Sequence, residues 1–213
     1  MKNIFVVIGT RPEAIKLAPV IRCLNASNWA RCRVVLTGQH RELVEPILLH
    51  FGVVVAHDLR VMQPNQSLSK VTARILEGLD ELLLAHHPDA VVGQGDTASV
   101  LAASMASFFR HIPFAHVEAG LRTGNPKLPF PEEMNRVLTS RVADWHFAPT
   151  EPTRTNLLNE GVVPSRIWVT GNTVIDALLQ VCERLDRDKK FAEKTRAALL
   201  EKFQGRTQGS PLH

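Results

Sequence analysis

The order of its apolar and amphipathic runs constrains the fold of this chain more than any other feature. Short runs rich in Val, Ile and Phe alternate with longer stretches of helical periodicity as far as about residue 185. A strand, a crossover helix and a second strand form the repeating unit of parallel sheets. The sequence therefore predicts an α/β fold with a Rossmann-like, doubly wound parallel sheet.

Six runs are predicted as strands and seven as helices of that domain. The strands are expected over residues 4–8, 33–36, 90–93, 114–117, 145–148 and 167–170. The helices are expected over residues 12–24, 42–51, 68–85, 99–109, 132–142, 153–160 and 174–185. Beyond them, a charged helix over 187–203 leads to residues 204–213, which lack periodicity and are typical of a linker or frayed end. We therefore expect a domain over residues 1–185 and a tail over residues 186–213.

Composition disfavours several classes of protein. No run of about 18 apolar residues exists, and the apolar start of the chain is too short for a secretory signal, so a cytoplasmic protein without a membrane span is expected. Basic residues are scattered and aromatic residues are only 6% of the chain, which favours an anionic small molecule over nucleic acid as ligand. The three cysteines form neither a disulfide framework nor a zinc pattern, and no other cluster has metal-ligand spacing.

Carboxylates follow two of the predicted strands, and a third comes soon after. Asp96 lies just past the run at 90–93, Glu118 just past the run at 114–117, and Glu132 opens a later helix. Ligands of open α/β sheets bind at the carboxyl ends of the strands, and several carboxylates there suit proton transfer. The structural alternatives are a helix cap at Asp96-Thr97 and a helix-dipole partner at Glu132. Arg136, one turn further on, either binds ligand or caps the helix.

The turn Gly9-Thr10-Arg11-Pro12 lies between the first predicted strand and the first helix. Free N–H groups at such a helix start can bind an anion, and Arg11 adds a forked donor for phosphate; the alternative is a plain tight turn. The turn is not a G-x-G-x-x-G fingerprint, so no nicotinamide cofactor is indicated. His116 is interpreted as structural and His40 as a solvated loop residue.

Six motifs in a fixed order give a resemblance to one family. They are GTRPEAIK (residues 9–16), QHR (39–41), GDT (95–97), HVEAGLRTG (116–124), PEEMNR (131–136) and TGNTVID (170–176). Each motif alone is weak, but the ordered set, over about residues 2–185, closely resembles the non-hydrolysing UDP-N-acetylglucosamine 2-epimerases. The resemblance implies a two-domain fold like that of the GT-B glycosyltransferases, of which this chain supplies the first half.

The resemblance also implies an activity, the interconversion of UDP-N-acetylglucosamine and UDP-N-acetylmannosamine through 2-acetamidoglucal, without a metal or redox cofactor. The residues that it assigns to acid/base catalysis are Asp96, Glu118 and Glu132, and those that it assigns to substrate binding are Arg11, Gln39, Gln66 and Arg136. Arg11 is expected to help hold the diphosphate. Gln39 and Gln66 fall where family members bind a second, activating substrate molecule. The full-length enzymes are expected to be homodimers.

The sequence departs from the family in one large respect. Neither the His-Arg-Arg-Glu motif nor the Asp-Ser-Gly-Gly segment of the family's second domain occurs in it. We therefore expect an amino-terminal half. Its function is then that of the first epimerase domain or of a truncated, inactive nucleotide-sugar-binding domain. A related glycosyltransferase or a hydrolysing epimerase is disfavoured by the whole motif set.

Overall fold

The structure, a computed structural model, describes residues 1–39 and 41–207. The chain divides into two compact units, an α/β unit over Met1–Thr173 and a helical unit that starts at Val174. Among the described residues, no helix is both long and apolar enough to cross a membrane.

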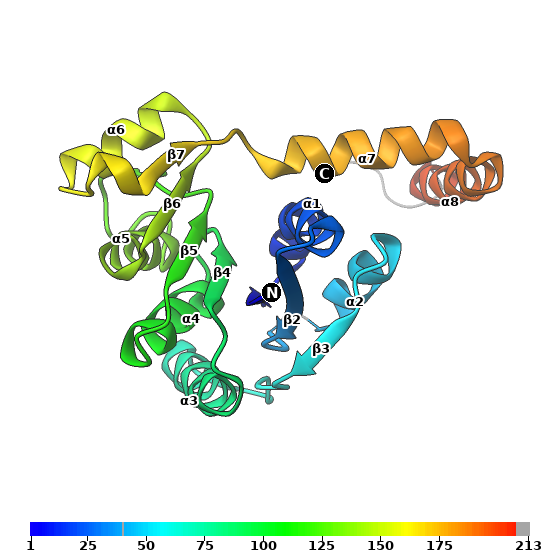
Figure 1. Cartoon of the computed structure of the whole chain (residues 1–213). Coiled ribbons are helices and arrows are strands. Elements are labelled where there is room, and N and C mark those ends of the chain that lie inside the picture. Colours follow the sequence, from blue (N-terminus) through cyan, green and yellow to red (C-terminus); the bar gives the residue numbers. More distant parts are fainter. Residues whose placement is uncertain (40, 208–213) are drawn as a thin grey trace. The chain divides into compact units, whose positions relative to one another are not determined.

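One sheet of seven parallel strands forms the α/β unit (Figure 1), which confirms the predicted fold class. The strands are β1 (Lys2–Ile8), β2 (Ala30–Leu36), β3 (Val55–Asp58), β4 (Ala90–Gln94), β5 (Phe114–Val117), β6 (Trp145–Ala148) and β7 (Ile167–Val169). Their order is β3-β2-β1-β4-β5-β6-β7, so the winding direction reverses between β1 and β4. Open α/β sheets bind ligands at such a switch point.

Helices connect the strands and cover parts of both faces of the sheet. They are α1 (Arg11–Ala26), α2 (Arg41–His50), α3 (Leu68–His86), α4 (Ala98–Phe109), α5 (Glu132–Val142), α6 (Glu151–Asn159), α7 (Thr173–Arg187) and α8 (Lys189–Thr207). In addition, a short 3-10 turn, Pro164–Arg166, precedes β7. Helices α7 and α8 supply the helical unit, and the first residue of α7 closes the α/β unit.

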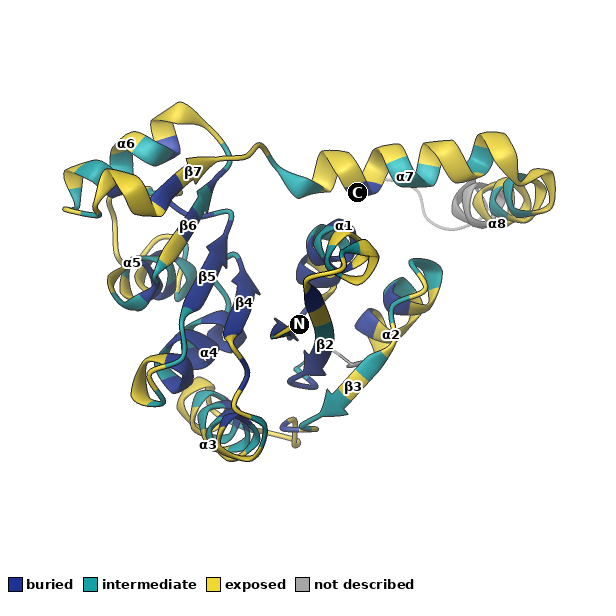
Figure 2. Cartoon of the chain, in the orientation of Figure 1, coloured by how far each residue is buried: buried dark blue, intermediate teal, exposed yellow. Residues whose placement is uncertain are grey.

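Alternation along the strands divides the core of the α/β unit into two layers. In β1, Ile4 and Val6 pack with residues of α1 and α2, whereas Phe5 and Val7 pack with residues of α3 and α4. Successive strand side chains point to opposite faces, so one strand serves both layers. Burial of each such side chain contributes about 1.5–3 kcal/mol. Figure 2 shows the central strands buried between helices whose outer faces are exposed.

All six predicted strands are present, but the prediction missed β3. This strand is at the edge of the sheet, pairs only with β2, and has no fully buried residue. Its sequence, VAHD, shares only its first two residues with the apolar run VVVA at residues 53–56, and its other two residues are polar. A half-exposed edge strand carries a shorter apolar run than a buried parallel strand does.

Most helix boundaries differ from the prediction by one or two residues, and the end of α8 differs by four. Helix α6 begins at Glu151, two residues early, because Thr150 and Thr153 form a capping box there. Helix α8 continues to Thr207 instead of ending at residue 203. The rest of the expected irregular tail, residues 208–213, lies outside the described residues.

Candidate active site

The carboxyl ends of β1, β4 and β5 form one rim of the sheet. Parallel pairing brings the ends of β4 and β5 level, with Gln94 opposite Val117. Asp96 and Glu118 follow these strands directly, and they reach the same rim for that reason. Arg11 opens α1 after β1, and Glu132 opens α5.

Three donors surround the carboxylate of Glu118, whose side chain is 11% exposed. Lys16 Nζ lies 2.5 Å from Oε2, and the side-chain amide of Gln94 donates to the same oxygen. The side-chain amide of Asn172 donates to Oε1 over 3.3 Å. The backbone of Glu118 has a φ of 62°, a left-handed conformation that non-glycine residues rarely adopt. The backbone is therefore locally strained at Glu118.

Asp96 is held from the side of α5. Its Oδ2 lies 2.6 Å from a guanidinium nitrogen of Arg136, and the side-chain amide of Asn135 donates to its backbone oxygen over 2.9 Å. Burial raises the pKa of Asp96; the charge of Arg136 opposes this rise, and the charges of Glu132 and Glu118 add to it. The charges of Glu118 and Glu132 therefore act on Asp96 at this rim. Their catalytic roles stay a prediction.

The two consecutive glutamates at the start of α5 have different environments. Glu133 is 2% exposed and accepts the backbone N–H groups of Thr123 and Gly124 over 2.9 and 3.0 Å. It therefore holds the loop that follows Glu118. Glu132 is half-buried, and its charge acts on Asp96. The structure thus gives Glu133 a structural function and leaves Glu132 as the candidate for chemistry.

Glu13 fills the start of α1. Its Oε2 accepts the backbone N–H groups of Gly9 over 2.5 Å and of Thr10 over 3.2 Å, and its Oε1 accepts the hydroxyl of Thr97 over 2.6 Å. The expectation that free N–H groups of this turn bind an anion is therefore wrong for these two amides. Burial raises the pKa of Glu13, and the bonds from Thr97 and the backbone oppose that rise. Glu13 joins the β1–α1 turn to the β4–α4 turn.

The residues predicted to bind substrate differ in exposure and in their hydrogen-bond partners. Arg11 is exposed, whereas the Arg136 side chain is 11% exposed and fixed by Asp96. Gln39 Oε1 accepts the hydroxyl of Ser99 over 2.9 Å, which ties it to the start of α4. Gln66 bonds within its own loop, where its side-chain amide donates to the Val61 carbonyl over 3.2 Å. Their substrate-binding roles stay predictions, and His40 lies outside the described residues.

His116 supports the β4–α4 turn from inside the protein. It is fully buried, and its Nε2 lies 2.7 Å from the carbonyl oxygen of Gly95. Burial lowers the pKa of His116 to about 4, so the ring is neutral at pH 7 and Nε2–H is the donor to that carbonyl. His116 therefore has the structural role that the sequence predicted.

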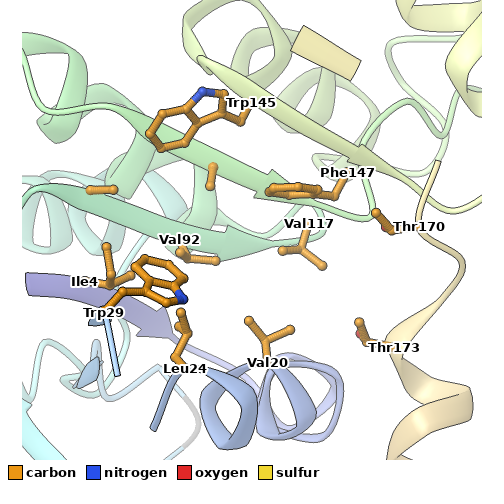
Figure 3. A pocket seen from close by; sticks show the side chains of 12 residues that line it. Ile4, Val20, Leu24, Trp29, Val92, Val117, Trp145, Phe147, Thr170 and Thr173 are labelled. Carbon is orange, nitrogen blue, oxygen red and sulfur yellow. The ribbon is translucent and has the colours of Figure 1, made fainter. Parts of the chain in front are cut away.

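An apolar cavity of about 350 Å³ lies on the sheet face next to α1 (Figure 3). Val92, Val117 and Phe147 contribute to its floor, and Val20 and Leu24 of α1 contribute one wall. The residues that line it include no acid, base or cation and none of the predicted site residues. This cavity therefore offers no group for acid/base chemistry. Among the described residues, no group of His, Cys, Asp and Glu has the arrangement of a metal site.

The fold and the rim together define an α/β domain that presents carboxylates and cations at the switch point of a parallel sheet. A family model described as UDP-N-acetylglucosamine 2-epimerase matches residues 22–205. The chain belongs to this UDP-N-acetylglucosamine 2-epimerase family.

Individual relatives agree with that assignment. The chain is 48% identical over 195 residues to the UDP-N-acetylglucosamine 2-epimerase of Escherichia coli K12, a match that covers 92% of this chain and 52% of the relative. It is similar to the solved structure of the Neisseria meningitidis UDP-GlcNAc 2-epimerase bound to UDP-GlcNAc, with a TM-score of 0.87, 46% identity, and coverage of 92% of this chain and 53% of that one. The chain thus spans about half the length of the curated relatives it matches.

A more distant likeness shows the fold alone. A lipopolysaccharide outer core galactosyltransferase matches 81% of this chain and 46% of its own chain with a TM-score of 0.58 at 16% identity. A glycosyltransferase and the epimerases therefore share this α/β architecture.

Sequence reasoning missed four contributors to the rim. Glu13, Lys16 and Asn172 lie inside quoted motifs but are not assigned to the predicted site, and Gln94 is not singled out. The signal in each case is a polar residue at the end of a strand or in the first turns of a helix, which many structural residues share. Only the contact with Glu118 or with the neighbouring turn distinguishes them.

Proposed function

We propose that the chain is the amino-terminal half of an enzyme that interconverts UDP-N-acetylglucosamine and UDP-N-acetylmannosamine. The observation that carries this proposal is the gathering of Asp96, Glu118 and Glu132 with Lys16 and Arg136 at one rim, in a member of the epimerase family. The solved Neisseria meningitidis relative with bound UDP-GlcNAc supports the nucleotide-sugar substrate.

The chemistry requires carboxylates and cations together. One carboxylate takes the proton from C2 of the sugar, the C–H electron pair forms the C1=C2 double bond, and UDP leaves with the C1–O pair. Delivery of a proton to the opposite face of C2 and return of UDP to C1 complete the epimerisation. The C2 proton is weakly acidic, so a base of raised pKa suits its removal, and burial and neighbouring carboxylates raise the pKa of Asp96.

Departure of UDP puts negative charge near the rim, where cations stabilise it. Arg11 is exposed at the start of α1, and we assign it to the diphosphate. Glu13 occupies the amides of Gly9 and Thr10, so side-chain donors rather than these amides serve the leaving group. Arg136 and Lys16 already pair with carboxylates, and they moderate the charge of those groups.

The decisive experiment compares the chain alone with a fusion. Residues 1–185, which we propose as the domain limit, are joined to the remaining carboxyl-terminal part of the Neisseria meningitidis relative. Both proteins are incubated with UDP-N-acetylglucosamine, and NMR follows the formation of UDP-N-acetylmannosamine. We expect turnover by the fusion and negligible turnover by the 213-residue chain, since contacts from a second half would complete the site. Absence of turnover in a folded fusion contradicts the proposal.

Substitution of the carboxylates tests their roles in the fusion. Asp96→Asn, Glu118→Gln and Glu132→Gln keep the shape of the side chains and remove their acid/base capacity. General acid/base groups contribute about 10²–10⁴-fold, so each variant is expected to lose kcat on that scale. A variant that keeps full kcat removes that residue from the proposed mechanism.

A second candidate is a truncated, inactive nucleotide-sugar-binding domain. It is favoured by the fact that the chain spans about half the length of its curated relatives. Calorimetric titration of the chain with UDP and with UDP-N-acetylglucosamine tests it. The expected result is binding of these ligands without turnover, both by the chain alone and by the fusion.

Light scattering of the fusion tests the homodimer that we propose for the full-length enzyme.

A further inference from the structure

Gln94 ends β4, and only 3% of it is exposed. Its register partner is Val117, the residue that precedes Glu118. Burial of an amide costs free energy unless it is hydrogen-bonded. The side-chain N–H of Gln94 finds its acceptor in Oε2 of Glu118. An interior polar residue of β4 is therefore committed to one carboxylate oxygen of the proposed active site.

The two oxygens of Glu118 are bonded unequally. Oε2 accepts from both Gln94 and Lys16, the latter over 2.5 Å. In the described part of the chain, Oε1 has only the longer bond from Asn172, over 3.3 Å. A carboxylate oxygen with two short bonds has little acceptor capacity left, so Oε1 is the oxygen that can take a proton.

The chemical nature of each donor matters to this arrangement. The ammonium of Lys16 favours the charged form of a carboxylate, and a second cation on Oε2 would oppose protonation further. The amide of Gln94 is neutral, so it fixes the position of the group with a smaller bias toward the charged form. A carboxylate that must alternate between base and acid benefits from such a neutral anchor.

We propose that Gln94 is a positioning residue that, together with Lys16, fixes Oε2 of Glu118 and leaves Oε1 to exchange the proton with the sugar. This inference rests on the proposed epimerase function. On the face of the sugar that Glu118 serves, the C2 proton moves to Oε1, the C–H electron pair becomes the C1=C2 bond, and UDP leaves with the C1–O pair. Gln94 touches no reacting atom and acts through Glu118.

The first test needs no turnover. Carboxyl carbon NMR of the ¹³C-Glu-labelled 213-residue chain follows protonation of Glu118, whose signal is identified by its loss in Glu118→Gln. Gln94→Met removes the donor at similar volume, and loss of a donor disfavours the charged carboxylate. The midpoint of this titration is expected to rise by about one pH unit. Gln94→Glu, which adds a like charge, is expected to raise it further.

Gln180→Met, a glutamine of α7 outside the α/β unit, is the matched control and is expected to leave the midpoint unchanged. An unmoved midpoint in both Gln94 variants, each shown to be folded by circular dichroism, overturns the proposal. So does an equal shift in the control.

The second test uses the fusion. The acid limb of the pH profile of kcat is expected to move upward in Gln94→Met by the same amount as the NMR midpoint, with the KM for UDP-N-acetylglucosamine unchanged. A loss of activity confined to KM, or an unmoved acid limb, contradicts a positioning role. Absence of turnover in the fusion of natural sequence refutes the proposed function instead. The NMR titration still tests, in that case, whether Gln94 controls the protonation of Glu118.

Discussion

Glu13→Ala is the substitution that tests most directly how the rim is built. It leaves the buried N–H groups of Gly9 and Thr10 without their acceptor and removes the bond from Thr97. Each unpaired buried amide costs about 1–3 kcal/mol, and each lost buried methylene costs about 0.8 kcal/mol. Relief of the buried carboxylate offsets part of this cost. We expect a net loss of about 3 kcal/mol in the free energy of unfolding.

Glu13→Gln is the matched control, because its amide has the shape of the carboxylate. Its carbonyl oxygen can accept both backbone N–H groups in place of Oε2, and its NH₂ can donate to the Thr97 hydroxyl. The expected loss is about 1 kcal/mol or less. Urea unfolding of the chain at pH 7, with the m-value compared between variants, measures both. A Glu13→Ala variant whose free energy of unfolding lies within about 1 kcal/mol of that of the natural chain would show that these bonds do not support the rim.

The same pair of variants has a pH dependence of fixed sign. Burial raises the pKa of Glu13 above its ordinary value of 4.5, so the folded chain binds this proton more tightly than the unfolded chain. The contribution of Glu13 to stability is therefore greatest below pH 4.5 and is lost as the pH rises through the folded pKa. Glutamine does not titrate, so its disadvantage relative to the natural chain is expected to shrink from pH 4 to pH 7. A disadvantage that grows over that range would refute the burial argument.

Three further predictions concern the rim and its support. Gly120→Ala is expected to lower the free energy of unfolding by at least 2 kcal/mol more than Gly161→Ala does. Both glycines have a left-handed φ, but an added Cβ would lie 2.2 Å from the Thr153 backbone oxygen at Gly120 and would meet nothing within 4 Å at Gly161. Equal urea midpoints of the two variants would contradict this. The pKa of His116 is lowered from 6.5 to about 4, so its stabilising contribution is full above pH 6.5 and is lost as the pH falls toward 4. The urea midpoint of the natural chain is therefore expected to fall more steeply across this window than that of a folded His116→Gln variant, and parallel curves would exclude this cause. In the fusion, Arg136→Met is expected to raise the pKa of Asp96 and move the pH profile of kcat upward, since Arg136 opposes the rise caused by burial; an unchanged profile would separate this ion pair from catalysis.

The sequence by itself determined the parallel sheet and the place of two carboxylates. Alternation of apolar and amphipathic runs is a local property, and it sets strand and helix positions without knowledge of the rest of the chain. Once the strands are parallel, residues that follow their carboxyl ends share a rim. Asp96 and Glu118 were placed at one rim on that ground alone, and the strand order agrees.

The tertiary structure decided what surrounds those carboxylates. Lys16 and Glu118 are 102 residues apart in sequence, and Thr97 is 84 residues from Glu13, so no local pattern predicts either contact. The tertiary structure likewise separated Glu132 from the buried Glu133, and it showed that Glu13 occupies amides that the sequence had left for an anion. Edge strand β3 was missed because only its first two residues belong to a short apolar run, VVVA at residues 53–56, and its other two residues are polar. Periodicity reports which face of an element is buried, whereas hydrogen-bond partners depend on how distant elements are brought together.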